Sequence, residues 1–188
     1  MRAFVLEVPE ELLAERRRTG ADRRDEVWNG VLHMVPAPSF WHQRFGGELY
    51  VVLKSLLQDR GLLVVYEVSI HRPGTKSDYR TPDLVVCRPE HASERGVEGV
   101  AALAVEILSP DDETYEKVPF YESVGVEELL VLDPKSRKAE LFVRRGERLL
   151  PALPDDAGTL RSPTLGVSFT LVPGPLLEVR WTGGSARI

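Results

Sequence analysis

The chain contains a single cysteine, Cys87, so it cannot form an intramolecular disulfide. Its first residues lack the long apolar run and the small-residue cleavage site of a secretory signal. Its wholly apolar stretches are short, whereas a helix that spans a bilayer needs roughly 20 such residues. We therefore expect a cytoplasmic protein with no membrane partner.

Several catalytic signatures are absent as well. The sequence has no glycine-rich phosphate-binding loop, no Cys-x-x-Cys pair, no His-Glu-x-x-His and no Gly-x-Ser-x-Gly. Asparagine, glutamine and lysine are scarce, with 1, 2 and 5 residues against 19 arginines and 14 prolines. This composition is typical of proteins from thermophiles and equally of proteins from GC-rich genomes.

The overall charge gives little support to a nucleic-acid partner. The 188 residues include 24 Lys+Arg and 29 Asp+Glu, for a net charge of −5. Phosphate binding depends on basic residues, although net charge does not say where those residues lie. The hydrophobic fraction of 43% is sufficient to bury a continuous core, and we expect a single domain over residues 1–188.

Local patterns predict two helices and a hairpin in the N-terminal part. Residues 9–18 carry acids in the first turn and arginines in the last, which predicts a short helix. Asn29-Gly30 predicts a β-hairpin over residues 26–35, because this pair supplies the positive φ angles of a type I′ turn. Apolar residues spaced by three and four predict a helix from Ser39 to about Asp59.

The rest of the chain alternates strands with one helix. Predicted strands cover residues 62–70, 83–87, 100–108 and 127–132, with a polar loop or hairpin tip over 71–81, a helix over 114–124 and a hairpin over 138–150. A strand–helix–strand crossover implies a mixed sheet. We expect an α/β (α+β) fold: a mixed central β-sheet flanked by helices, with hairpins on both sides. The core spans about 25–145, and a β-rich extension spans about 146–188.

Three carboxylates interrupt the apolar strands: Glu67, Asp83 and Glu106. A carboxylate inside a buried strand costs several kcal/mol unless it is paired or bound to metal. Any one of the three is explained by exposure to solvent or by an arginine partner. Asp83 and Glu106, however, both lie near ends of apolar strands, and two such acids that converge predict a site for a hard divalent cation such as Mg²⁺.

These acids belong to a longer motif. It consists of Thr81-Pro82-Asp83-Leu84-Val85-Val86, Val105-Glu106-Ile107-Leu108-Ser109-Pro110, Lys117, Tyr121, Gly125-Val126, Glu128 and Asp133-Pro134. Pro82-Asp83, with Glu106 23 positions after the aspartate, resembles the PD-(D/E)XK signature of the restriction-endonuclease superfamily. The whole string is similar to the Uma-type family of predicted restriction endonucleases and covers roughly residues 25–145.

The resemblance implies a restriction-endonuclease-like sheet and a metal site. Asp83 and Glu106 would bind Mg²⁺ or Mn²⁺ together with the backbone carbonyl of Ile107, and a lysine would lie near the attacking water. The third motif position, usually lysine, is Leu108 here. In the Uma-type family the lysine has moved to the following helix, which indicates Lys117. Whether its ammonium group reaches the metal site is a question of geometry.

Further candidates flank this set. His42 and Glu48 belong to the first long helix, which in this fold packs near the site, and Glu67 alternates with apolar neighbours on its strand. Each has a structural explanation as well: a capping or core histidine, or a solvated acid.

Three cations lie in the polar loop before Asp83: Arg72, Lys76 and Arg80. Their proximity to the predicted metal site suggests contacts with a DNA backbone. Solvated loop charges are the alternative explanation for each one.

The leading functional hypothesis is a Mg²⁺-dependent DNA endonuclease. One alternative is a catalytically degenerate nuclease fold that serves as a binding module, which Leu108 and the acidic net charge favour. A second alternative uses the β-rich C-terminal half for self-association. A homodimer is implied by the resemblance, because many such enzymes cut two strands with two subunits.

Overall fold

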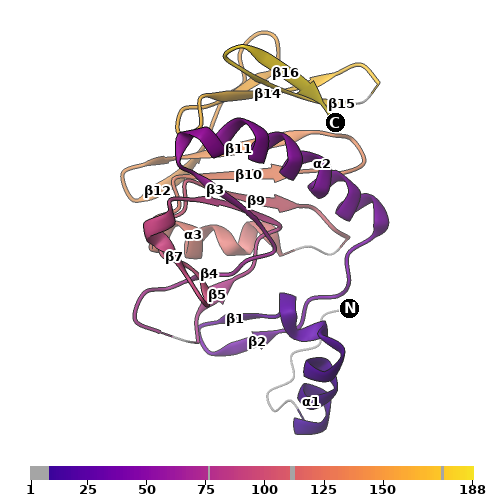
Figure 1. Ribbon diagram of the computed structural model, residues 1–188, viewed down its shortest axis with the longest axis vertical. Helices are drawn as coiled ribbons and strands as arrows, with labels where there is room; N and C mark the ends of the chain where they lie inside the picture. Colours follow the sequence, from indigo (N-terminus) through magenta and orange to yellow (C-terminus); the bar gives the residue numbers. More distant parts are fainter. Residues whose placement is uncertain (1–8, 76, 111–112, 175) are drawn as a thin grey trace.

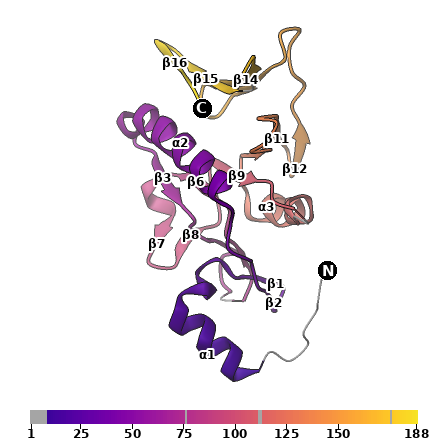
Figure 2. The ribbon, with the colours of Figure 1, turned by 90° about the vertical axis from the view of Figure 1, so that its right-hand side faces the viewer.

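The computed structural model describes residues 9–75, 77–110, 113–174 and 176–188 (Figure 1). The described chain forms three sheets that succeed one another along the long axis of the molecule. The C-terminal sheet lies at one end, the central sheet in the middle and the N-terminal sheet toward the other end, with helix α1 beyond it (Figures 1 and 2). Lys76 lies outside the described residues.

The central sheet is mixed, as the sequence predicts. Its strands are β3 (Leu63–Tyr66), β6 (Leu84–Cys87), β9 (Leu103–Ile107), β10 (Glu128–Leu132), β11 (Ala139–Arg145) and β12 (Arg148–Pro151), in the order β12-β11-β10-β9-β6-β3. Strands β9 and β10 are parallel and the other neighbours are antiparallel. The crossover between the parallel strands runs through the 3-10 helix η4 (Thr114–Lys117) and helix α3 (Val118–Val124). Pro119 lies in the first turn of α3. A proline is tolerated there because the backbone N–H groups of the first turn have no hydrogen-bond partner within the helix.

Helix α2 (Phe40–Leu57) and the C-terminal sheet share one hydrophobic core with the central sheet. Ser39 caps α2, because its Oγ accepts a hydrogen bond from the His42 backbone N at 3.2 Å. The buried face of α2, with Phe45, Leu49 and Leu53, packs in the same cluster as Phe169 of the C-terminal sheet. That sheet contains β13 (Thr159–Ser162), β14 (Val167–Val172), β15 (Leu176–Trp181) and β16 (Gly184–Arg187), all antiparallel.

The opposite face of the central sheet is covered by α3 and by the N-terminal sheet. This second sheet contains β1 (Glu26–Trp28), β2 (Val31–His33), β4 (Ile70–His71), β5 (Tyr79–Arg80), β7 (Ala92–Ser93) and β8 (Gly96–Glu98). Asn29 and Gly30 have φ angles of 50° and 89°, which confirms the predicted turn between β1 and β2. Helix α1 (Glu10–Thr19) ends at Gly20, which adopts the left-handed conformation. Further 3-10 turns are η1 (Ala21–Arg24), η2 (Gln58–Arg60) and η3 (Pro89–His91).

The prediction of one strand over residues 62–70 is wrong. The segment forms β3 in the central sheet and contributes Ile70 to β4 in the N-terminal sheet. Glu67 separates the two with a φ of 47°, a value incompatible with a continuous strand. Residues 71–81, predicted as a loop or hairpin tip, form the tip of a hairpin in which β4 pairs with β5, and β5 also pairs with β1. The break after β3 arises because β3 pairs with β6 whereas β4 pairs with β8, and local periodicity does not report such distant partners.

None of the helices in the described ranges has both the length and the apolar character needed to cross a membrane.

Candidate active site

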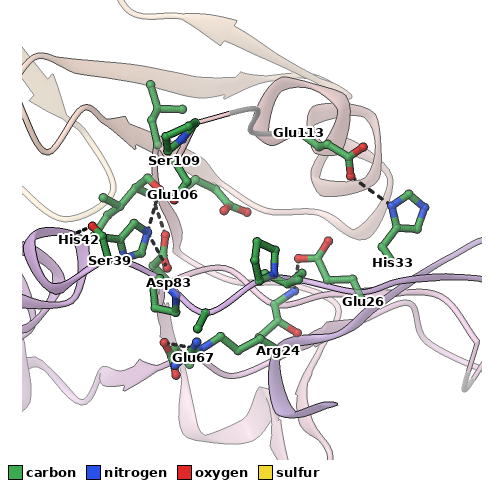
Figure 3. Close-up of a pocket in the computed structure, with 18 of the residues that line it drawn as sticks. Arg24, Glu26, His33, Ser39, His42, Glu67, Asp83, Glu106, Ser109 and Glu113 are labelled. Carbon is green, nitrogen blue, oxygen red and sulfur yellow. Dashed lines mark hydrogen bonds and ion pairs between the residues drawn. The ribbon is translucent and has the colours of Figure 1, made fainter. Parts of the chain in front are cut away.

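A cavity of about 1160 Å³ opens beside the end of β9. Figure 3 shows labelled side chains from the N-terminal hairpin, the start of α2 and the central sheet, together with others such as Arg24 of η1 and Glu113 just before η4. Among its lining residues are the carboxylates Glu26, Glu67, Asp83, Glu106 and Glu113. The cavity therefore contains all three acids that the sequence singled out.

Asp83 and Glu106 are brought together by the register of β6 and β9. Leu84 pairs with Val105 in these antiparallel strands, so one further step along the register sets Asp83 opposite Glu106. Side chains directly opposite one another on antiparallel strands share a face, with Cβ atoms about 5 Å apart. The Asp83 Oδ2 atom accepts a hydrogen bond from the Ile107 backbone N at 2.6 Å, which holds this carboxylate at the strand end.

Lys117 contacts two carboxylates that line the cavity, those of Glu106 and Glu26. Its Nζ lies 3.1 Å from both carboxylate oxygens of Glu106 and 2.9 Å from Oε1 of Glu26. Glu106 faces the side of the sheet that α3 covers, and Lys117 lies at the end of η4, just before α3. Leu108 packs against the hydrophobic cluster on that side. The ammonium group of the site thus comes from Lys117 on a helical turn, while the third motif position, usually lysine, is the apolar Leu108.

Glu26 is a site residue that the sequence reasoning missed. It is 1% exposed, and its second carboxylate oxygen, Oε2, accepts a hydrogen bond from Trp28 Nε1 at 2.7 Å. The Thr81 backbone N donates to Oε1 at 2.9 Å. These contacts depend on the pairing of β1 with β5, and no local pattern in residues 26–28 predicts them.

Tyr121 is a second buried partner of the site. Its hydroxyl donates to Oε1 of Glu106 at 2.5 Å, and its side chain is fully buried. Burial and the neighbouring charges of Glu106 and Glu26 raise the pKa of this phenol well above its usual value, so the hydroxyl keeps its proton. The sequence pointed to Tyr121 only as part of the family motif.

One ammonium group faces several carboxylates, and the ionisation of the site follows from this imbalance. Burial raises the pKa of Glu106 to about 8, with further increases from Asp83 and Glu26 and an opposing effect from Lys117. Burial alone would lower the pKa of Lys117, but the attraction of Glu106 and Glu26 outweighs it and the pKa is raised. Without a further cation, Lys117 remains charged and Glu106 retains a proton at neutral pH.

His42 and the Ile107 carbonyl lie at the edge of the same cluster. The His42 Nε2 atom donates to the Ile107 carbonyl oxygen at 2.9 Å and lies 3.4 Å from Oδ1 of Asp83 (Figure 3). The first turn of α2 thereby contacts the predicted metal ligands directly.

Glu67 and Glu48 differ in their placement. Glu67 lines the cavity, where its Oε1 lies 2.8 Å from both Arg24 Nε and Gln43 Nε2. Glu48 is absent from the cavity lining that the structure describes, and its Oε1 pairs with Arg44 Nε at 2.8 Å. The structure therefore brings Glu67 to the predicted site and leaves Glu48 on the outer side of α2.

Arg80 has a structural role instead of the surface role predicted for it. It is 4% exposed, and its guanidinium lies 4.4 Å from the ring centroid of Trp28 and 4.2 Å from that of Phe120. Its Nη1 donates to Asp78 Oδ1 at 3.0 Å, while Arg72 Nε bonds the other oxygen of Asp78 at 2.6 Å. The two cations thus share the single carboxylate of Asp78; the Arg72 side chain stays 38% exposed, whereas Arg80 is too buried to contact DNA.

Replacing Arg80 with glutamine is expected to destabilise the protein by about 3 kcal/mol. The substitution removes the buried guanidinium group that pairs with the Asp78 carboxylate. Urea unfolding measures this effect, and the exposed Arg88→Gln is the matched control. The slope of DNA affinity against salt concentration should not change. A slope reduced by about 0.9 with unaltered stability would instead indicate a phosphate contact.

The donor set fits a hard divalent cation. Mg²⁺ usually takes one or two carboxylates and completes its shell with water and phosphate oxygens. Asp83, Glu106 and the Ile107 carbonyl offer that combination at one strand end. Nowhere in the described ranges do three or more His, Cys, Asp or Glu side chains form a group that could hold a metal ion. Water and substrate would therefore supply the remaining ligands.

The chain is similar to a described protein family and to a solved structure. A family model named Uma2, with the description "Putative restriction endonuclease", matches residues 9–173. No curated protein matches the chain. A solved structure titled "a putative nuclease belonging to DUF820 from Anabaena variabilis ATCC 29413" has the same fold, with a TM-score of 0.60 and 18% sequence identity. The match covers 75% of this chain and 82% of that chain.

Proposed function

The chain belongs to the Uma2 family of restriction-endonuclease-like proteins, and from this premise we propose that it is a metal-dependent endonuclease that hydrolyses DNA phosphodiester bonds. Membership supports a nuclease in general. The finer proposal is carried by one observation: Asp83 and Glu106 lie opposite each other at a strand end, with the Lys117 ammonium 3.1 Å from Glu106.

In this proposal Asp83, Glu106 and the Ile107 carbonyl hold Mg²⁺ or Mn²⁺. The metal would lower the pKa of a bound water and neutralise charge on the phosphate. The Ile107 backbone N orients Asp83 through its hydrogen bond, and His42 orients the Ile107 carbonyl. These contacts support ligand positions that are fixed before substrate arrives.

Lys117 takes the role of the motif lysine. An ammonium group next to the metal ligands can orient the attacking water and stabilise negative charge that develops on the phosphate oxygens. Glu26 lies 2.9 Å from Lys117 Nζ and keeps the pKa of the ammonium raised, so Lys117 acts as a donor and not as a base. Tyr121 also holds Glu106 in place, through the hydrogen bond from its hydroxyl.

A catalytically degenerate binding module is the second candidate function. It is favoured by the engagement of both Glu106 oxygens with Lys117 and of Oε1 with Tyr121, because a metal must compete with these donors. Such a module binds DNA without cutting it.

Cleavage of supercoiled plasmid DNA in the presence of Mg²⁺ or Mn²⁺, and no cleavage with EDTA, is the expected result for the enzyme. Calorimetric titration should also show that Asp83→Asn binds Mn²⁺ roughly tenfold more weakly than the natural chain, or more weakly still, because one anionic ligand is lost. DNA binding without cleavage at any metal concentration would support the degenerate module. The predicted homodimer, cytoplasmic location and single-domain organisation stay predictions, as does the pair of explanations for the composition, a thermophile or a GC-rich genome.

A further inference from the structure

Two large aromatic side chains lie exposed in the first turn of α2. Phe40 is 71% exposed and Trp41 is 61% exposed. Their ring centroids are 5.1 Å apart at an interplanar angle of 83°, so they contact each other edge to face. Neither residue belongs to the hydrophobic clusters of the core. Exposing this much aromatic surface brings no gain in stability, and such surface is a common feature of binding sites.

The aromatic pair is continuous with the proposed active site. Trp41 itself lines the cavity that contains Asp83 and Glu106. The next residue, His42, contacts Asp83 through its ring at 3.4 Å. Because Ser39 caps the helix at this point, the backbone that carries the aromatic pair is held in a regular first turn. Figure 3 shows Ser39 and His42 side by side next to Asp83.

Cationic side chains accompany the aromatic pair. The Arg44 guanidinium lies 5.8 Å from the ring centroid of Trp41, and its side chain is 55% exposed. Lys135 is exposed and lines the same cavity. An aromatic face with nearby cations is suited to a nucleotide, whose base stacks while its phosphate is neutralised.

The charge balance of the cavity favours an unpaired strand over a duplex. Among the residues that the structure describes, the lining carboxylates are Glu26, Glu67, Asp83, Glu106 and Glu113, and the lining Lys and Arg residues are Arg24, Lys117 and Lys135. Arg24 and Lys117 already pair with Glu67 and Glu106. Duplex binding relies on many phosphate contacts, whereas stacking on an aromatic ring adds affinity without further cations.

We propose that Phe40 and Trp41 form a stacking platform for an unpaired nucleobase beside the scissile phosphate. The preferred substrate is then single-stranded DNA or a duplex with a locally unpaired segment. This inference rests on the proposed function, because it assumes that the cavity hydrolyses the phosphodiester bond. The stacking itself is a binding property and can be measured without cleavage.

Fluorescence anisotropy with labelled oligonucleotides in EDTA tests the platform without any cleavage. The probes are a single strand of mixed sequence and the blunt duplex of the same length. Trp41→Ala is expected to weaken single-strand binding roughly tenfold and to leave duplex binding unchanged, since base stacking on an aromatic residue is lost. Trp41→Phe should retain most of the affinity. Leu153→Ala, at a side chain 89% exposed and outside the cavity lining, is the matched control.

The outcomes separate this inference from the proposed nuclease activity. Single-strand binding that depends on Trp41 in a protein that never cleaves DNA supports the platform and contradicts the activity. Metal-dependent cleavage with equal loss of single-strand and duplex binding in Trp41→Ala, or with no loss of either, overturns the platform. A shift from dimer to monomer in Trp41→Ala, measured by sedimentation, with unchanged DNA binding would assign the aromatic pair to a second copy of the chain and also overturn it.

Discussion

Replacing Glu106 with glutamine is expected to reduce DNA cleavage by roughly a thousandfold or more while the protein remains folded. The substitution removes one anionic ligand of the proposed metal, and such a ligand supports several kcal/mol of transition-state stabilisation. The amide keeps the shape of the side chain and can still accept the hydrogen bond from Tyr121. A plasmid nicking assay at saturating Mg²⁺ and Mn²⁺ measures the loss.

Glu147→Gln is the matched control, because Glu147 is exposed and lies outside the cavity lining. It should cleave at the natural rate. Undiminished cleavage by Glu106→Gln would contradict the proposed site.

Glu106→Gln should also gain stability relative to the natural chain as pH rises in EDTA. The pKa of Glu106 is raised from 4.5 to about 8 in the folded protein, chiefly by burial. Between these values the folded state binds more protons than the unfolded state, so the natural chain loses stability as pH increases. Glutamine does not ionise and escapes this loss. Urea unfolding at pH 5 and pH 9 measures the difference, and an equal response of the two proteins would contradict the raised pKa.

Lys117→Met is expected to lower both stability and activity. Removal of the ammonium leaves the buried Glu26 carboxylate without its cation, and breaking a buried ion pair in this way costs about 3–5 kcal/mol. Loss of a charged donor beside the reacting phosphate should also reduce cleavage about 100-fold to 1000-fold. Urea unfolding and the nicking assay measure the two effects separately.

A double variant separates the structural from the catalytic role of Lys117. Glu26→Gln combined with Lys117→Met removes one uncompensated charge, so stability should largely return while cleavage stays low. Lys138→Met, at an exposed position, is the control for loss of a lysine. Recovery of cleavage together with stability would mean that Lys117 only maintains the fold.

Local sequence patterns predicted most elements of the fold because their causes are local. The Asn29-Gly30 turn has the positive φ angles that its residue types favour, and Ser39 caps α2 through a backbone N three positions away. The crossover between β9 and β10 follows from a strand–helix–strand pattern, which admits few topologies. The metal-ligand candidates Asp83 and Glu106 were identified in the same way, as acids at the ends of apolar strands.

Contacts between distant segments could not be predicted in this way. The positive φ of Glu67 moves the chain from one sheet to another, and pairing of β1 with β5 buries Glu26 beside Lys117. Arg80 looked like a free cation of a polar loop, but it lies between Trp28 and Phe120. In each case a residue's role depends on a partner more than ten positions away, which hydrophobic periodicity and residue propensity do not encode.

The sequence by itself determined the family motif, most elements of the central sheet and the two acids that opposing strands present. The tertiary structure alone decided that Lys117 reaches Glu106 and that Arg80 does not reach the surface. The physical reason is that a turn or a cap is stabilised by neighbours along the chain. A buried ammonium or guanidinium group is instead stabilised by carboxylates and aromatic rings that only sheet pairing and helix packing bring within a few ångströms.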